Sequence, residues 1–347
     1  MTREMHGLLL RQDGFAKMDG FAGNQIERPG DFLELGTLPR PTPGPGQILI
    51  KMRRAAINPS DIAFVQGFYG QPRKQGQPAG FEGVGTVVEA GPGLMGKILK
   101  GRDVAFYVTP DGSGTWAEYA VTQAALAVPL KKGMADRDAA GLVVNPVTAA
   151  AMLDLVRTGD AFVFSAAASQ LGKLVASLAR DQNKKMIGIV RREAPIKALK
   201  DLGAAQVLNE SDTGYPNELA AVLDREKPVI FLDAVAAESS AKIHKAMGKN
   251  ARWIIYGKLD AAKAEILDPG ELIFRNKSIE GFWTTAWANK TPFLRKMRVF
   301  GEVQNRFRDG RWTTDISAEL PLETAITRLP QALSQPDGKV QIILPND

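Results

Sequence analysis

The fold class can be predicted from the stretch Ala161-Phe162-Val163-Phe164-Ser165-Ala166-Ala167-Ala168-Ser169-Gln170-Leu171-Gly172. Its beginning is a short apolar run, which predicts a buried strand over residues 161–165. Small residues follow, and from Gln170 to Asp181 the apolar residues recur at helical spacing and share one face. A strand, a tight turn and a helix in this order predict one unit of a parallel sheet covered by helices.

The same alternation of strand and helix continues along the chain beyond Pro129. Apolar runs bounded by turn residues predict further strands at 186–190, 206–208, 229–232 and 252–256. Repeated units of this kind predict a doubly wound α/β fold, the Rossmann pattern that binds nucleotides.

Residues 1–128 have a different pattern, in which short apolar runs are separated by Gly and Pro. Predicted strands at 47–52, 83–90, 103–108 and 116–122 indicate a β-rich domain. After Phe274, a strand-like 278–283, a helix at 292–308 and late strands around Ile316 and Val340 predict a tail that rejoins this domain. A chain of 347 residues exceeds the usual size of a single core, so we expect one domain of residues 1–128 and 275–347 and a second of residues 129–274.

The turn before the helix stands where a dinucleotide-binding fingerprint would read G-x-G-x-x-G. Small residues replace the first two glycines, and only Gly172 is kept. Alanine and serine still permit close backbone approach, and a helix N-terminus attracts pyrophosphate. We therefore predict cofactor contacts from Ala168, Ser169, Gln170, Leu171 and Gly172. The alternative is an alanine-rich helix start that binds no ligand.

Arg191 and Arg192 follow the second predicted strand, where an acidic residue would normally bind the ribose hydroxyls of NAD. A ribose 2′-phosphate carries close to two negative charges, and guanidinium groups bind it bidentately. The pair therefore favours NADPH over NADH. Glu193 next to the pair leaves NADH as a possible cofactor. The alternative interpretation is that the two arginines are merely solvated at the end of a strand.

The composition excludes several classes of protein. The chain has no cysteine and two histidines, which rules out disulfides and leaves too few ligands for a typical zinc site. The net charge of +6 is spread along the chain, so we expect no nucleic-acid binding. The apolar run after Gly7 is too short for a signal peptide, and the apolar stretch 139–153 is broken by Asn145 and Pro146. We expect a soluble, cytoplasmic protein that contacts no membrane.

Several stretches resemble the medium-chain dehydrogenase/reductase superfamily over nearly the whole chain. The strongest are Ile57-Asn58-Pro59-Ser60-Asp61-Ile62, Gln66-Gly67-Phe68-Tyr69-Gly70 and Gly80-Phe81-Glu82-Gly83-Val84-Gly85. The zinc ligands of the alcohol dehydrogenases are missing, so the chain resembles the zinc-free branch. Shorter pieces at 145–149, 190–192, 256–258 and 281–283 are similar to 2-enoyl thioester reductases, and quinone oxidoreductases share many of them. Residues 338–340 resemble the last cofactor-contacting strand of the family. The phosphate turn without its usual glycines and the polar insertion 73–77 depart from the family pattern.

The resemblance implies a GroES-like catalytic domain beside the Rossmann domain, and it implies roles for individual residues. Tyr69 would lie near the substrate and could donate a proton, or it could only pack over the cleft. Asn58 would face the nicotinamide ribose or the substrate, whereas Asp61 would cap the helix that starts after Pro59. Further cofactor contacts would come from Asn145, Thr148, Tyr256, Phe282, Trp283 and Lys339. Core packing is the alternative role for the aromatic residues.

Taken together, the resemblance implies NADPH-dependent hydride transfer, without zinc, to a small electrophile. Either a quinone or an α,β-unsaturated carbonyl such as an enoyl thioester would serve. A protein that binds the cofactor without turnover, or an RNA-binding relative of quinone reductases, is the alternative. Family members commonly form homodimers through an edge strand of the nucleotide domain, and the segment 252–256 would suit that role.

Overall fold

The computed structural model describes residues 4–17, 23, 25–262, 264–265, 268–335 and 338–345. The chain forms two compact units, one of Met1–Val144 with Phe300–Asp347 and the other of Asn145–Val299. Both chain termini thus belong to the first unit, with the second inserted between its segments. The expected boundaries at 128 and 274 lie earlier in the chain than those of the two units.

The second unit contains a six-stranded sheet of the doubly wound type. Its strands are β8 (Ala161–Phe164), β9 (Lys185–Val190), β10 (Gln206–Asn209), β11 (Ile230–Asp233), β12 (Arg252–Ile255) and β13 (Ser278–Gly281). The order is β10-β9-β8-β11-β12-β13, and every neighbouring pair is parallel. This order places the two central strands, β8 and β11, on either side of the point where the winding reverses. The predicted Rossmann fold is confirmed.

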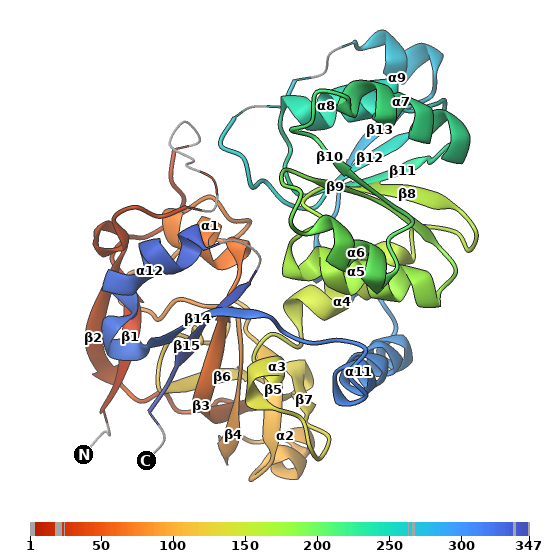
Figure 1. The fold of residues 1–347 in the computed structure, drawn as a ribbon. Coiled ribbons are helices and arrows are strands. Elements are labelled where there is room, and N and C mark those ends of the chain that lie inside the picture. Colours follow the sequence, from red (N-terminus) through yellow and green to blue (C-terminus); the bar gives the residue numbers. More distant parts are fainter. Residues whose placement is uncertain are drawn as a thin grey trace. The chain divides into compact units, whose positions relative to one another are not determined.

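Helices lie on both sides of this sheet, with α5 (Gln170–Asp181) and α6 (Ile196–Leu202) on one side and α7 (Tyr215–Glu226) and α8 (Glu238–Ala246) on the other (Figure 1). The helix α5 has the predicted bounds, and its apolar face is buried. Shorter helices are α9 (Gly270–Phe274) and α10 (Thr284–Lys290), while α4 (Val144–Leu153) and α11 (Phe293–Arg308) span the borders between the units.

The strand β13 differs from the expected assignment, because the sequence placed residues from 275 onward in the first domain. It pairs in parallel with β12 and completes the Rossmann sheet. Arg252 and Glu280 reinforce the pairing with two hydrogen bonds of 2.7 and 2.6 Å between guanidinium and carboxylate. The sequence predicted a strand at 278–283, but it held no local sign that this strand pairs with β12. Consequently β13, and not the segment 252–256, is the edge strand on this side of the sheet.

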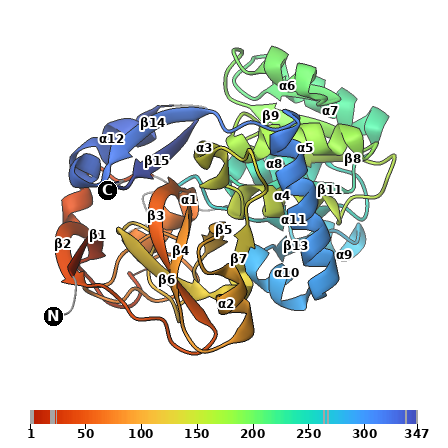
Figure 2. The ribbon, with the colours of Figure 1, turned by 90° about the horizontal axis from the view of Figure 1, so that it is seen from below.

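The first unit contains a mainly antiparallel sheet in which the last strands of the chain join the early ones. Its path runs β14 (Ile316–Pro321), β15 (Lys339–Ile343), β3 (Gln47–Ile57), β4 (Glu82–Ala90), β5 (Asp103–Tyr107) and β7 (Ala127–Pro129), while β6 (Tyr119–Gln123) pairs with β3. The pairing of β15 with β3 confirms that the tail rejoins the first domain. The helix α12 (Ala325–Ser334) lies beside these late strands (Figure 2).

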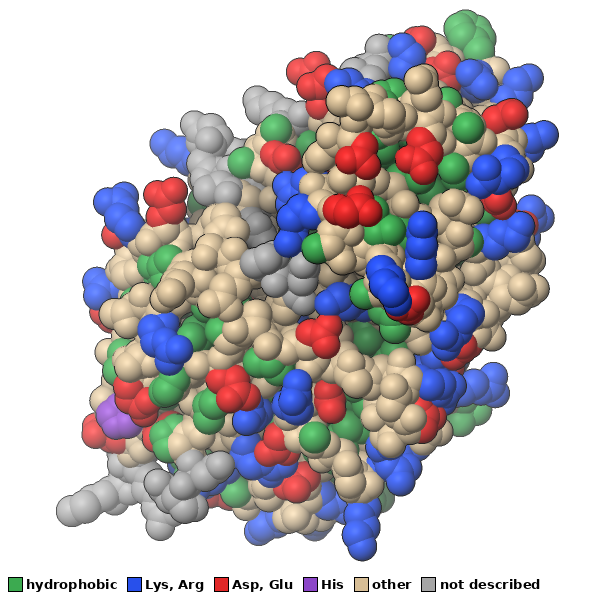
Figure 3. Space-filling view, in the orientation of Figure 1, with side chains coloured by type: hydrophobic (Ala, Val, Ile, Leu, Met, Phe, Trp, Pro, Cys, Tyr) green, Lys and Arg blue, Asp and Glu red, His purple; other side chains and the backbone are tan. Residues whose placement is uncertain are grey.

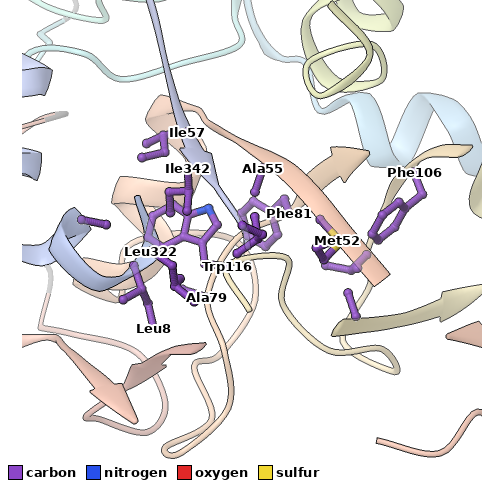
Figure 4. Close-up of a cluster of buried hydrophobic side chains, with 14 of the residues drawn as sticks. Leu8, Met52, Ala55, Ile57, Ala79, Phe81, Phe106, Trp116, Leu322 and Ile342 are labelled. Atoms are coloured by element: carbon purple, nitrogen blue, oxygen red, sulfur yellow. The ribbon is translucent and has the colours of Figure 1, made fainter. Parts of the chain in front are cut away.

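Large apolar side chains fill the interior of the first unit. Figure 4 shows Trp116, Phe106 and Met52 among residues from several strands, with Leu322 and Ile342 contributed by the C-terminal segment. Each such side chain contributes about 1.5–3 kcal/mol when it is fully buried. A Cβ at Gly80 would lie 2.2 Å from Cδ1 of Trp116, and its φ of +93° also requires glycine. Gly80 therefore lets the chain pass over the tryptophan ring just before β4.

The structure contains some elements of the first unit that the sequence did not predict. The strands β1 (Glu4–Leu10) and β2 (Leu33–Pro39) form a separate antiparallel pair, and its leucines at 8–10 are buried. The helices α2 (Leu94–Leu99) and α3 (Asp136–Ala139) are also new, whereas α1 (Pro59–Gln66) starts after Asn58 as expected. No helix in the described part of the chain is both long and apolar enough to cross a bilayer.

Candidate functional site

The turn between β8 and α5 is packed too tightly to admit a larger residue at Gly172. A Cβ on Gly172 would lie 2.1 Å from the carbonyl oxygen of Ala167, and a Cβ on Gly188 in β9 would lie 2.9 Å from the Cβ of Ala167. Ala166 takes a φ of +49°, a left-handed conformation that glycine adopts more easily. The turn is therefore close-packed at Gly172 and passes through one left-handed residue at Ala166.

The residues predicted to contact the cofactor from this turn lie at the carboxyl end of β8. The Ser169 hydroxyl caps α5 by accepting a hydrogen bond from the backbone nitrogen of Gly172 at 3.1 Å. Ala168 and Ser169 are half-buried, whereas Gln170, Leu171 and Gly172 are buried. Gly172 supplies the close helix-to-strand packing that the fingerprint requires, so the turn fits a pyrophosphate.

A buried carboxylate that the sequence did not predict accepts hydrogen bonds at the same edge of the sheet. Asp233 ends β11 and is fully buried. Its Oδ1 accepts from the Ser165 hydroxyl at 2.6 Å, and its Oδ2 accepts from Nε1 of Trp253 at 2.8 Å. Backbone nitrogens of Val235 and Ala236 complete the set at 2.9 and 3.1 Å. Asp233 therefore links the carboxyl ends of β8 and β11, at the edge where α/β proteins bind nucleotides, and also holds the Trp253 side chain from β12.

The aromatic residues expected at the nicotinamide end follow β12 and β13 at this edge. The Tyr256 hydroxyl is buried, and no hydrogen-bond partner for it occurs among the described residues. Burial raises the pKa of Tyr256 well above its usual value, so the hydroxyl stays protonated and can donate. Phe282 is half-buried, and Trp283 is 45% exposed. An orphaned donor of this kind is uncommon in a folded interior and fits a polar ligand.

Asn145 and Thr148 both lie on α4 at the start of the second unit. Thr148 is buried, and its hydroxyl lies 2.6 Å from that of Thr284 on α10. Asn145 is half-buried. The paired hydroxyls place Thr148 next to the segment that carries Trp283.

Arg191 and Arg192 are exposed and follow β9 directly. Glu210, after the neighbouring strand β10, has a pKa that burial raises and that the charge of Arg191 lowers. The side chain of Arg191 thus has a carboxylate near it. Elsewhere, Lys and Arg side chains are interspersed with Asp and Glu over the face in Figure 3 and do not form one basic stripe.

In the first unit, four buried polar side chains gather around the start of α1. Asp61 accepts from the backbone nitrogens of Asn58 at 2.7 Å and Phe81 at 2.8 Å, which makes it the expected helix cap. Asn58 Nδ2 donates to Glu82 at 2.8 Å, and Lys339 Nζ donates to Asn58 Oδ1. Burial, reinforced by the nearby charge of Glu82, raises the pKa of Asp61 to about 7. Neither Glu82 nor its contact with Lys339 through Asn58 was predicted.

Tyr69 lies just after α1, half-buried, with its ring centroid 4.9 Å from that of Phe81. The backbone of Phe81 is in turn held by Asp61. The polar insertion that follows has a structural role, because Arg73 is buried and donates to the carbonyl oxygens of Gly14 and Val65. This departure from the family pattern therefore anchors the loop that carries Tyr69.

The structure thus groups the predicted residues within each unit. Tyr69, Asn58 and Lys339 belong to the first unit, and the remaining predicted residues belong to the second. Within the described ranges, no cluster of three or more His, Cys, Asp or Glu side chains is arranged to hold a metal ion.

Comparison with known proteins agrees with this architecture. Residues 44–132 match the alcohol dehydrogenase GroES-like domain, and residues 171–297 match the zinc-binding dehydrogenase family. Mitochondrial enoyl-[acyl-carrier-protein] reductase of Mus musculus is 31% identical over 305 residues, which cover 85% of this chain and 80% of that protein. The Bos taurus protein of the same name is 29% identical and covers 89% of this chain and 83% of its own length.

A solved structure from Mesorhizobium loti, provisionally named an NADPH:quinone reductase, superposes with a TM-score of 0.93. It is 46% identical, and the match covers 99% of both chains. One of these two family names mentions zinc, whereas this chain has no cysteine and two histidines. The chain belongs to the medium-chain dehydrogenase/reductase superfamily, in the zinc-free branch of quinone oxidoreductases and 2-enoyl thioester reductases.

Proposed function

We propose that the chain is an NADPH-dependent oxidoreductase that reduces the carbon–carbon double bond of an α,β-unsaturated carbonyl compound, most specifically an enoyl thioester. The observation that carries the proposal is the phosphate turn at the carboxyl end of β8, with Gly172 packed on Ala167 and two guanidiniums after β9. The mouse and cattle relatives, which are enoyl-[acyl-carrier-protein] reductases, support the substrate class.

The residues of the second unit would hold the cofactor by its phosphates. The turn 166–172 would receive the pyrophosphate at the start of α5, and Arg191 with Arg192 would bind the 2′-phosphate. Thr148, Tyr256, Phe282 and Trp283 would lie toward the nicotinamide, with Asn145 nearby. When bound, NADPH supplies the hydride for the reduction. The buried hydroxyl of Tyr256 supports this arrangement, because it lacks a partner among the described residues.

The residues of the first unit would act on the substrate and the nicotinamide. Tyr69 would keep a proton on its phenol oxygen and donate it, or a hydrogen bond, to the substrate as negative charge develops on the carbonyl side. Asn58 would orient the nicotinamide ribose or the substrate, and Lys339 would contact the cofactor. Arg73 supports the role of Tyr69, because it fixes the loop after that residue.

Quinone reduction is the second candidate, and the 46% identical Mesorhizobium loti structure favours it. A quinone needs the same hydride donor but presents a flat ring, with no thioester chain. The two substrates differ in what must fit beside Tyr69.

Parallel assays of NADPH oxidation with crotonyl-CoA and with a small quinone test the proposal. We expect turnover of crotonyl-CoA with the higher kcat/KM. A higher kcat/KM for the quinone would assign the second function. If NADPH binds but neither compound is reduced, and the chain binds RNA in a salt-dependent way, the non-catalytic alternative holds.

We also propose a cytoplasmic homodimer that forms through the outer edge of β13. This edge strand pairs only with β12 among the described residues, and its neighbourhood exposes Ile273 and Phe274, at 72% and 81%. Such an edge and apolar surface are typically covered in a soluble protein. Size-exclusion chromatography with light scattering would detect the dimer, and an Ile279→Pro variant in β13 should yield monomers.

A further inference from the structure

The buried polar network of the first unit contains three ionisable side chains, Asp61, Glu82 and Lys339, in an interior that disfavours unpaired charges. Asp61 and Glu82 are fully buried, Asn58 is 2% exposed and Lys339 is 5% exposed. Isolated charges in such a place are unfavourable by several kcal/mol unless they are paired and hydrogen-bonded. The network must therefore balance its charges internally.

Glu82 is placed to be ionised. Its Oε1 accepts from Asn58 Nδ2 at 2.8 Å, and its Oε2 accepts from the backbone nitrogens of Val143 and Val144 at 3.2 and 2.8 Å. Every partner is a donor, so a protonated carboxyl group would direct its hydrogen at another hydrogen. Burial raises the pKa of Glu82 above its ordinary value, and Lys339 together with these donors offsets part of that rise.

This carboxylate also determines how the Asn58 amide is turned. With Nδ2 committed to Glu82, Oδ1 faces Lys339 and accepts from its Nζ. The reversed amide would place oxygen against a carboxylate and nitrogen against a lysine, which gives two repulsive contacts. Glu82 therefore decides which atom Asn58 presents to Lys339.

The charge of Lys339 depends on the same carboxylates. Burial lowers the pKa of Lys339, while the charges of Glu82 on β4 and Asp61 on α1 raise it. Charged residues on the surrounding elements are paired with one another, since Arg54 on β3 binds Glu319 on β14 and Arg53 on β3 binds Asp136 on α3.

We propose that Glu82 is a positioning residue for the reaction: it orients the Asn58 amide and holds Lys339 as an ammonium for the anionic cofactor. The inference rests on the proposed function only in that Lys339 and Asn58 meet cofactor or substrate. Glu82 itself touches neither and acts through these two side chains.

Glu82→Gln tests the proposal, because the amide keeps the size of the side chain and removes its charge. In protein labelled with ¹⁵N at the lysine Nζ, the Lys339 signal, identified by its loss in Lys339→Arg, is followed across pH. We expect its titration midpoint to fall by roughly 1–3 pH units in Glu82→Gln. NADPH affinity, measured by fluorescence, should then be lost on the alkaline side at correspondingly lower pH.

Matched variants separate charge from structure. Glu89→Gln makes the same change at the exposed far end of β4 and should leave the Lys339 midpoint in place. Glu82→Asp keeps the charge, so it should preserve the midpoint even if NADPH affinity drops because the amide is no longer held. In Lys339→Arg the alkaline loss of NADPH affinity should vanish.

An unchanged Lys339 midpoint in Glu82→Gln would overturn the inference and leave the proposed function intact. Failure of the wild-type protein to bind NADPH would overturn the function, while the lysine titration would still report on Glu82. Should Glu82→Gln not fold, a wild-type Lys339 midpoint at or below neutral pH would equally refute the proposal, because the lysine would then not be an ammonium.

Discussion

Replacing Gly172 with alanine should lower both the stability of the nucleotide-binding unit and its affinity for the cofactor. The new Cβ would lie 2.1 Å from the carbonyl oxygen of Ala167 and 2.7 Å from its carbonyl carbon, where ordinary contact begins at 3.4 Å. These are backbone atoms, so the turn or α5 must move by about 1 Å. Overpacking of this kind destabilises a protein by typically 1–3 kcal/mol, and we expect about 3 kcal/mol here, because backbone yields less than side chains.

The same movement displaces the turn that would face the pyrophosphate. The loss of one hydrogen bond to a charged group is worth about 1.5–3 kcal/mol, so NADPH should bind at least tenfold more weakly. Urea unfolding and fluorescence titration with NADPH measure the two effects. Gly214→Ala is the matched control, since its Cβ meets no atom within 4 Å. Wild-type stability and NADPH affinity in Gly172→Ala would refute the packing argument.

Other substitutions test separate parts of the account. Ala166→Gly should raise the unfolding free energy by roughly 0.5–1 kcal/mol in urea, because the φ of +49° disfavours alanine, and lower stability would contradict this. The raised pKa of Asp61, about 7, means that the folded chain binds a proton that the unfolded chain has released. Its contribution to stability is therefore lost as the pH rises through 7, by roughly 1 kcal/mol between pH 6 and 8, and Asp61→Asn should flatten this part of the stability profile. Tyr69→Phe should lower kcat for crotonyl-CoA by about 10²–10⁴-fold with little change in NADPH affinity, and full turnover would remove Tyr69 as the proton donor.

The sequence predicts those parts of the fold that have local signals. The helix α5 has the predicted bounds because its apolar face and the small residues before it are contiguous in the chain. The strands β8 to β12 were also predicted within a few residues. In contrast, the strand that became β13 was predicted but assigned to the first domain, because no local signal shows that it pairs with β12. The N-terminal pair of β1 and β2 was missed because seven residues alone gave no clear strand period.

The candidate site divides in the same way. The positions of a predicted strand or helix are enough to predict a role for Arg191, Gly172 and Asp61. The contacts of Glu82 are not, because its partner Asn58 lies 24 positions away and Lys339 lies 281 positions from Asn58. Asp233 and Ser165 meet across 68 positions for the same reason. Such contacts depend on tertiary pairing, which a single sequence does not reveal.

The choice of cofactor is the claim on which the account depends, and one titration tests it. The affinities for NADPH and NADH are measured in the wild type, in Arg191→Ala and in Arg225→Ala, which removes another exposed arginine of the same unit. We predict that the wild type prefers NADPH and that Arg191→Ala weakens NADPH by roughly 10–100-fold while NADH and the control change little. Equal affinities for the two cofactors that neither substitution alters would contradict the account.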